Sequence, residues 1–291
     1  MPRSMPTLLL VSLLIFSAWV GPDEVERWRA VPPSYEAVTI PVLIAHAGGG
    51  LPAAAYTNSR EAFDLSARNG FCYIETDFRF SRDRKLVLVH EWANAYNPLG
   101  QLAIALLGAP NAADFTSRLT RDRVTPLDLP ALLEWLELHP AIQLITDTKD
   151  DNIRFMRALA PQLEGAMKAR FIVQIYSPEE LPEARRLGFD QIIFTLYKTS
   201  MGDAEVLAFA RRERLFAVTM PGARARGDLA KRLAEHGTPV FAHTINTAGE
   251  AYALGNNGVT GIYTDGLIPS QRCNPGRETS IERAGIAPAA P

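Results

Sequence analysis

The sequence has few cysteines, no excess of charge of either sign and no nucleotide-binding glycine motif. Cys72 and Cys273 are far apart, so they provide neither the ligand spacing of a metal site nor a disulfide framework. The 30 lysines and arginines nearly balance the 32 aspartates and glutamates, for a net charge of −2. This balance excludes the basic surface of a nucleic-acid-binding protein. Gly48-Gly49-Gly50 lacks the Gly-Lys-Ser/Thr ending of a P-loop and is expected to form a tight turn.

The amino-terminal segment differs in composition from the rest of the chain. Its apolar run, Leu8–Val20, has 13 residues, which suits the core of a signal peptide better than a membrane-spanning helix of about 20. The cleavage site is poorly formed, because Phe16 stands two positions before Ala18. We therefore expect a signal peptide or an uncleaved anchor over residues 1–20, followed by a linker over residues 21–41. The protein is predicted to be exported, periplasmic or secreted, with membrane association through its N-terminus as an alternative.

Beyond the linker, short apolar segments alternate with amphipathic helical segments. Hydrophobic residues make up 47% of the chain and charged residues 21%, which predicts a large packed core. The expected strands are rich in β-branched and aromatic residues: Val42–Ala47, Cys72–Phe80, Ile142–Lys149, Phe171–Ser177, Gln191–Tyr197, Leu215–Met220, Val240–Asn246 and Gly261–Asp265. Eight strands with helices between them predict an α/β fold, a single-domain (β/α)₈ TIM barrel over residues 42–270 with a tail over 271–291. An open doubly wound sheet is the competing fold, but no GxGxxG follows the first strand.

The alternation is interrupted after the second predicted strand. Lys85–His90 is expected to form a short extra strand after a turn at Asp83-Arg84. The segment Glu91–Arg123 is expected to be an irregular insertion before the third barrel strand. Within it, Leu102–Leu107 is strongly apolar. This stretch either contacts lipid or forms a buried helix over the mouth of the barrel, and burial is the outcome we expect.

Polar residues occur at the carboxyl ends of the first strands, where TIM barrels carry their active sites. They are His46, Glu75, Asp77, His90, Asp147 and Lys149. Within a strand, residues two positions apart point the same way, so Glu75 and Asp77 share a face, as do Asp147 and Lys149. Polar side chains there are costly unless they pair or bind something. The pattern therefore predicts a binding or catalytic site at this end of the barrel.

Several segments, in this order along the chain, resemble the glycerophosphodiester phosphodiesterases and the wider superfamily that these enzymes share with phosphatidylinositol-specific phospholipase C. The segments are Leu43–Gly49, Tyr56–Phe63, Gly70–Asp77, Asp83–His90, His243–Asn246 and Gly261–Asp265. The resemblance is to a divergent member, because four positions depart from the family pattern. Ala47 replaces an Arg, Thr57 a Glu, Asp147 a Glu and His243 a Trp.

The resemblance implies a metal-dependent phosphodiester hydrolase in which His46 and His90 form the acid–base pair. A neighbouring hydroxyl of the substrate would attack first and produce a cyclic phosphate. Lys149 can place a positive charge on the phosphate. Asn58, which the family pattern keeps, and His243, which replaces an aromatic residue, are expected to line the phosphate site. The substrate would be a small phosphodiester or a lipid head group.

Three carboxylates predict the cofactor. Glu75, Asp77 and Asp147 form an all-oxygen, anionic cluster, and such ligands suit Mg²⁺ or Ca²⁺ better than zinc. We therefore expect one divalent cation at these residues.

Two other functions stay open at this stage. One is a phospholipase C- or D-like enzyme that acts on lipid head groups, for which Leu102–Leu107 is a candidate contact. The other is a catalytically silent binding barrel, which the changes at Ala47 and Thr57 favour. The presence of both histidines and of the carboxylates favours an enzyme. The sequence does not determine the oligomeric state.

Overall fold

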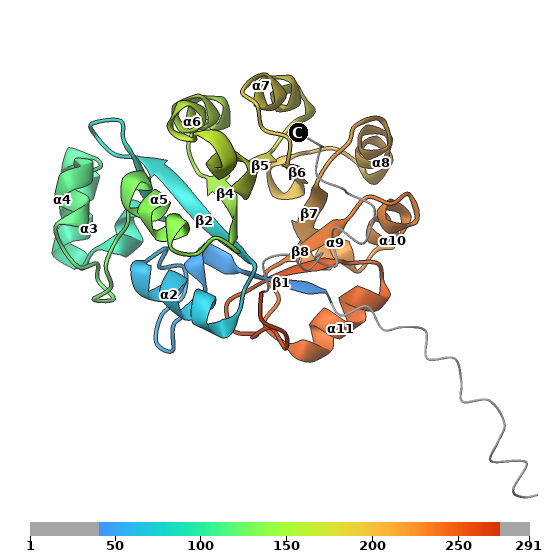
Figure 1. Ribbon diagram of the computed structural model, residues 1–291, viewed down its shortest axis with the longest axis horizontal. Coiled ribbons are helices and arrows are strands. Elements are labelled where there is room, and N and C mark those ends of the chain that lie inside the picture. The colour runs from blue at the N-terminus through green and yellow to red at the C-terminus, as the bar shows by residue number, and fades with distance from the viewer. Residues whose placement is uncertain (1–40, 274–291) are drawn as a thin grey trace, which may run out of the picture. The chain divides into compact units, whose positions relative to one another are not determined.

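The computed structural model describes residues 41–273, which form a closed barrel of parallel strands (Figure 1). The strands are hydrogen-bonded in the order β1-β9-β8-β7-β6-β5-β4-β2, and β1 pairs with β2 to close the ring. Their bounds are β1 (Val42–Ala45), β2 (Tyr73–Phe80), β4 (Gln143–Thr148), β5 (Phe171–Ile175), β6 (Ile192–Thr195), β7 (Ala217–Pro221), β8 (Val240–His243) and β9 (Gly261–Thr264). The predicted TIM barrel is confirmed. The predicted signal peptide or anchor, the linker up to residue 40 and the tail from residue 274 lie outside the described residues.

Helices surround the strands, as Figure 1 shows. They are α2 (Arg60–Asn69), α5 (Leu129–Glu137), α6 (Asn152–Leu159), α7 (Leu181–Arg186), α8 (Asp203–Arg212), α9 (Gly222–Ala225), α10 (Asp228–Glu235) and α11 (Ala248–Asn256). Short 3₁₀ turns add η1 (His46–Gly48), η2 (Trp92–Ala95), η3 (Ala160–Gln162), η4 (Gly165–Arg170), η5 (Pro178–Glu180) and η6 (Leu196–Lys198). Side-chain caps begin several helices: Ser59 accepts a hydrogen bond from the Ala62 N–H, and Asp128 accepts one from the Ala131 N–H. Among the described residues, no helix is both long and apolar enough to cross a membrane.

The segment between β2 and α5 contains more regular structure than the sequence predicted. The expected extra strand is present as β3 (Leu86–Leu88), antiparallel to β2. The expectation of an irregular insertion is wrong, because two helices form there, α3 (Pro98–Leu107) and α4 (Ala112–Thr116). Asn97 caps α3 by accepting from the Gly100 N–H, and Pro98 occupies its first turn. The helix lacks the polar face by which an amphipathic helix is recognised in a sequence, so these capping signals were missed.

The expected burial of Leu102–Leu107 over the barrel mouth is also wrong. Figure 1 shows α3 and α4 outside the ring of helices, beyond α5. No residue of α3 is buried. The insertion has its own small apolar cluster, made of Val87, Val89, Ala95, Ala112 and Phe115. No residue of α3 belongs to this cluster, and the helix lies on the surface.

The two cysteines form a disulfide, which the sequence did not predict. Cys72 stands just before β2 and Cys273 ends the described chain, yet their Cα atoms are 5.0 Å apart. The Cys273 N–H also donates a hydrogen bond to the Gly70 carbonyl at 3.0 Å. Closing the barrel brings these two segments together across a sequence separation of 201. No local pattern reports a contact at such a separation.

We expect removal of this disulfide to lower stability substantially. In the chain-entropy account, a cross-link that closes so long a loop restricts the unfolded chain, and its loss costs about 2–5 kcal/mol of unfolding free energy. The measurement is denaturant unfolding of the wild type with and without reductant, beside a Cys72→Ser, Cys273→Ser variant. Reductant should destabilise the wild type and leave the variant unchanged. Equal stability of all samples would contradict the assignment.

Candidate active site

The barrel interior is filled by alternate residues of each strand, and the same alternation brings polar side chains to its carboxyl end. An inner apolar cluster includes Ile44, Tyr73, Ile145 and Tyr263. Two positions further along the chain come Glu75 and Asp147, within β2 and β4, and His46 and Asp265, directly after β1 and β9. Because residues two apart share a face, the pattern that packs the interior also converges these groups at the mouth.

The turn after β1 holds His46 between two carboxylates. Its Nδ1 lies 2.9 Å from Asp265 Oδ1, and its Nε2 lies 3.9 Å from Glu75 Oε2. Burial lowers the pKa of His46, but the hydrogen bond to Asp265 and the charge of Glu75 outweigh it, so the pKa is raised. A Cβ at Gly50 would overlap the Asp265 carbonyl oxygen. Glycine therefore lets this loop pack directly against Asp265, the residue that follows β9.

Three buried carboxylates lie side by side next to His46. One oxygen each from Glu75, Asp77 and Asp147 lies within 4.8 Å of the others. The Ala47 N–H, in a left-handed conformation with φ of 51°, donates to Glu75 Oε2 at 2.8 Å. Burial and the charge of Asp77 nevertheless raise the pKa of Glu75 to about 8. With no further positive charge at the site, the cluster therefore retains a proton near neutral pH.

Lys149 lies against the same cluster. Its Nζ is 2.6 Å from Asp147 Oδ2 and 3.4 Å from Asp77 Oδ1. Burial alone would lower the pKa of Lys149, but the two aspartates raise it, so the side chain remains an ammonium. Burial opposes ionisation of Asp147, yet the Lys149 ammonium lowers its pKa. The lysine thus compensates two of the three carboxylates, and the nearest basic group to Glu75 is His46, at 3.9 Å.

Asn58 is fully buried, and its amide bonds to β2. Its Nδ2 donates to Asp77 Oδ2 at 2.9 Å, and its Oδ1 accepts from the Asp77 N–H and the Thr76 hydroxyl. The sequence predicted a phosphate contact for Asn58. This geometry favours a different role, the positioning of Asp77, because the amide is already engaged within the protein.

Four residues of the mouth were missed as functional candidates. They are Tyr176, Tyr197, Lys198 and Asp265. The Tyr176 hydroxyl donates to Asp147, and the Tyr197 hydroxyl lies 3.1 Å from the same carboxylate. The Lys198 Nζ donates to the Thr148 carbonyl at 2.8 Å and lies 3.7 Å from the centre of the Tyr176 ring. All four come just after strands β5, β6 and β9. The tendency of TIM-barrel active sites to lie at the carboxyl ends of strands could therefore have identified them.

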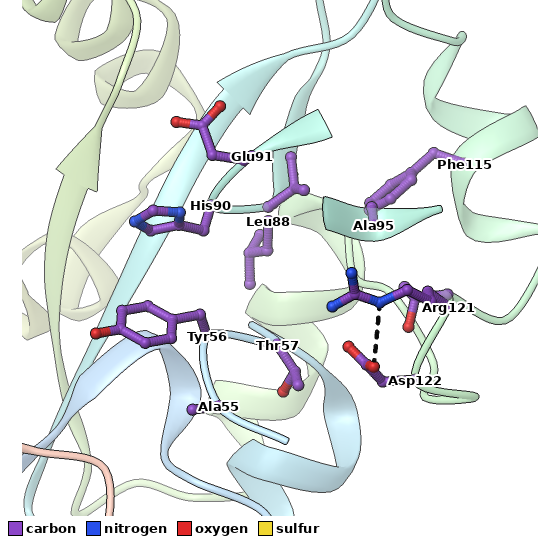
Figure 2. Close-up of a pocket in the computed structure, with 12 residues that line it drawn as sticks. Ala55, Tyr56, Thr57, Leu88, His90, Glu91, Ala95, Phe115, Arg121 and Asp122 are labelled. Carbon is purple, nitrogen blue, oxygen red and sulfur yellow. Dashed lines mark hydrogen bonds and ion pairs between the residues drawn. The ribbon is translucent and has the colours of Figure 1, made fainter. Parts of the chain in front are cut away.

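His90 lies near His46 and is separated from it by one aromatic ring. The Tyr56 ring lies between the two histidines, with its centre 4.8 Å from that of His46 and 5.2 Å from that of His90. Beyond His90 and Tyr56 a pocket of about 340 Å³ extends toward the insertion. Figure 2 shows these two rings at one side of it and Phe115 and Arg121 at the other. The insertion therefore shapes a space directly beside a candidate catalytic histidine.

His243 ends β8 inside the barrel mouth. Its ring makes edge contacts with Tyr197 and Tyr263, and among the described residues its buried Nε2 has no hydrogen-bond partner. Burial lowers the pKa of His243 to about 4. The side chain is therefore a neutral imidazole at physiological pH, which can offer a hydrogen bond to a bound group but no positive charge.

The carboxylate cluster fits a hard divalent cation. Its donors are all oxygens, they converge within the span of one coordination sphere, and Glu75 ionises only with difficulty while no cation offsets its neighbours. Glu75, Asp77 and Asp147 would hold the ion, and Asn58 would keep Asp77 oriented.

We expect Glu75→Gln to stabilise the metal-free protein at pH 8 while weakening Mg²⁺ or Ca²⁺ binding. Because the folded-state pKa of Glu75 is raised from 4.5 to about 8, its contribution to stability is lost as the pH rises through that window, and a neutral amide avoids the loss. Thermal unfolding and titration calorimetry measure the two effects, with Glu134→Gln on the exposed face of α5 as control. A less stable variant with unchanged cation affinity would contradict the site.

Comparison with protein-family models and with curated proteins finds no match. Solved structures match over most of the chain. A proposed glycerophosphodiester phosphodiesterase from Galdieria sulphuraria is 18% identical with a TM-score of 0.68, covering 79% of this chain and 95% of its own. The glycerophosphodiester phosphodiesterase from Thermotoga maritima is 17% identical with a TM-score of 0.56, covering 77% and 94%.

A phosphodiesterase from Oleispira antarctica, in complex with the product sn-glycerol-3-phosphate, is 17% identical with a TM-score of 0.54, covering 78% of this chain and 93% of its own. At such identities the likeness is one of fold. The chain thus has the barrel fold that these phosphodiesterase structures share.

Proposed function

We propose that this protein is a metal-dependent phosphodiester hydrolase of the glycerophosphodiester phosphodiesterase type, and a divergent member of that family. One observation carries the proposal. His46, the carboxylates Glu75, Asp77 and Asp147, and the Lys149 ammonium converge at the carboxyl end of a barrel whose fold is that of such enzymes. A silent binding barrel has no need of this costly burial of charge.

The charges at the mouth suit the chemistry of a phosphodiester. Its negative charge repels nucleophiles, so a useful site must neutralise the phosphoryl oxygens. Lys149 and Lys198 both lie beside Asp147, the first by a direct ion pair and the second through the Thr148 carbonyl. When bound, a divalent cation would supply further charge stabilisation to the same oxygens.

The histidines supply the proton transfers. Asp265 holds Nδ1 of His46, which fixes the ring and leaves Nε2 directed toward the carboxylate cluster. His90 contacts the Tyr56 ring and lines the neighbouring pocket. One imidazole accepts the proton of the attacking hydroxyl and the other protonates the leaving alcohol. Attack by a neighbouring hydroxyl of the substrate produces a cyclic phosphate, which water then opens.

The pocket beside His90 is proposed to hold one alcohol arm of a small phosphodiester. With the phosphorus at the carboxylate cluster, that arm would extend past His90 and Tyr56 toward Phe115. The Oleispira antarctica phosphodiesterase binds sn-glycerol-3-phosphate as its product. Glycerophosphodiesters are therefore the first substrates to assay.

We expect His46→Ala and His90→Ala each to lower kcat by about 10²–10⁴-fold while cation binding persists. Lys149→Ala should also raise KM, since the ammonium stabilises phosphate in the ground and transition states alike. Steady-state kinetics on a glycerophosphodiester with Mg²⁺, Ca²⁺ or chelator provide the test, and His236→Ala on the surface is the matched control. Near wild-type turnover in a double His46→Ala, His90→Ala variant would exclude the acid–base pair.

We also propose that the protein is exported, to the periplasm or beyond it. The disulfide supports this, because such bonds persist in oxidising compartments and are rare in the cytosol. Deleting residues 1–20 should retain the protein in the cytosol, as cell fractionation would measure, while the oxidised barrel melts within a few degrees of the full-length form. Export of the shortened chain, or a large drop in its melting temperature, would overturn the assignment.

A further inference from the structure

The outward face of α3 is an exposed apolar surface. Leu99 is 79% exposed, Leu102 57%, Leu106 74% and Leu107 70%. Their spacing places them on one face of the helix, and residues 98–107 include no charged side chain. Of the ten exposed large hydrophobic side chains in the described part of the chain, five belong to the insertion, Leu119 being the fifth. A helix without a polar face is normally buried, so this face requires an occupant.

The charge beside this face suits an anionic, phosphate-bearing surface. The Arg82 guanidinium lies at the carboxyl end of α3, where its Nη2 donates to the Leu107 carbonyl at 2.7 Å. From residue 98 to residue 123 there are three arginines and two aspartates, and Arg121 is paired with Asp122. A leucine face with an arginine at its end is a composition found in segments that lie in the headgroup region of a bilayer.

The face is small for a stable protein partner. Four leucines at these exposures present on the order of 500 Å², whereas each partner in a standard protein interface buries about 800 Å². The same area is ample for shallow insertion of leucine side chains into a lipid interface. A lipid surface is therefore the occupant that the area and the charge favour over a second copy of this chain.

The insertion also joins this face to the candidate active site. The Tyr96 ring packs against Phe115, with ring centres 6.5 Å apart, and lies beneath Gly100 of α3. Phe115 in turn lines the pocket that contains His90 and Tyr56 (Figure 2). The leucine face and the pocket beside His90 are thus linked through the Tyr96–Phe115 contact.

We propose that the leucine face of α3 docks on a phospholipid surface and that the substrate is a lipid-borne phosphodiester taken from that surface. The substrate half of the proposal rests on the proposed function, whereas the docking does not. The proposed docking does not require the N-terminal segment or the linker, because α3 would reach the lipid through its own side chains.

Docking is tested with a probe at α3 in the full-length protein. Cys72 and Cys273 are paired, so a Leu106→Cys variant offers one thiol for the environment-sensitive fluorophore NBD. A Leu138→Cys variant, at an equally exposed leucine (78%) that follows α5, is the control. Vesicles of phosphatidylcholine with phosphatidylglycerol should raise the emission and shift it to shorter wavelength at position 106 but not at position 138.

Other outcomes at position 106 overturn the docking. No response, or the same response at both positions, shows that α3 does not enter the lipid. Emission that is already shifted before vesicles are added shows that a protein segment covers the face. A shift that depends on protein concentration, with dimers in sedimentation, assigns the face to a second copy.

The substrate is tested with a Leu102→Ser, Leu106→Ser variant against a Leu138→Ser, Ile268→Ser control. The α3 variant should lose about tenfold in kcat/KM on vesicle-borne lysophospholipid and retain wild-type activity on soluble glycerophosphodiester. Equal losses on both substrates, or none, would overturn the lipid substrate. A wild type inactive on both substrates would instead refute the proposed function, and the fluorescence result would then decide docking alone.

Discussion

Mutual repulsion among Glu75, Asp77 and Asp147 is the constraint on which the rest of the site depends. The barrel places their oxygens within 4.8 Å of one another and largely shields them from water. In so small a volume, like charges cannot all persist without compensation. Each surrounding group offsets part of this repulsion. The Ala47 N–H bonds to Glu75, Asn58 bonds to Asp77, and the tyrosine hydroxyls bond to Asp147.

The negative charge of the three carboxylates is only partly compensated, and this imbalance suits the binding of a cation. Lys149 balances the two aspartates, while Glu75 keeps a pKa of about 8 because its neighbours are acidic and it is buried. A site that is short of positive charge attracts a cation, and the combined positive charge then suits a phosphate. His46 is drawn into the same field, with Asp265 behind it and Glu75 in front.

The insertion after β3 adds a second element that the barrel itself does not require. Its apolar cluster is separate from the barrel core and includes Val87 of β3. One side of this cluster shapes the pocket beside His90, and α3 packs above it with an exposed leucine face. The proposed reactive groups thus lie at strand ends, whereas the insertion bears both a wall of the pocket and the proposed lipid-facing surface.

The sequence by itself determined the barrel and the convergence of His46, Glu75, Asp77 and Asp147, because both follow from short-range periodicities. Alternation within a strand decides which side chains face inward, and parallel strands of a barrel end at one rim. Tertiary structure alone decided the rest. The burial of the Asn58 amide against Asp77 depends on how the loop after β1 packs on β2. The partnership of His46 with Asp265 across 219 positions and the Cys72–Cys273 bond depend on ring closure. The exposure of α3 likewise depended on whether another part of the chain covered it, since a leucine-rich helix has the same local pattern whether it is buried or exposed.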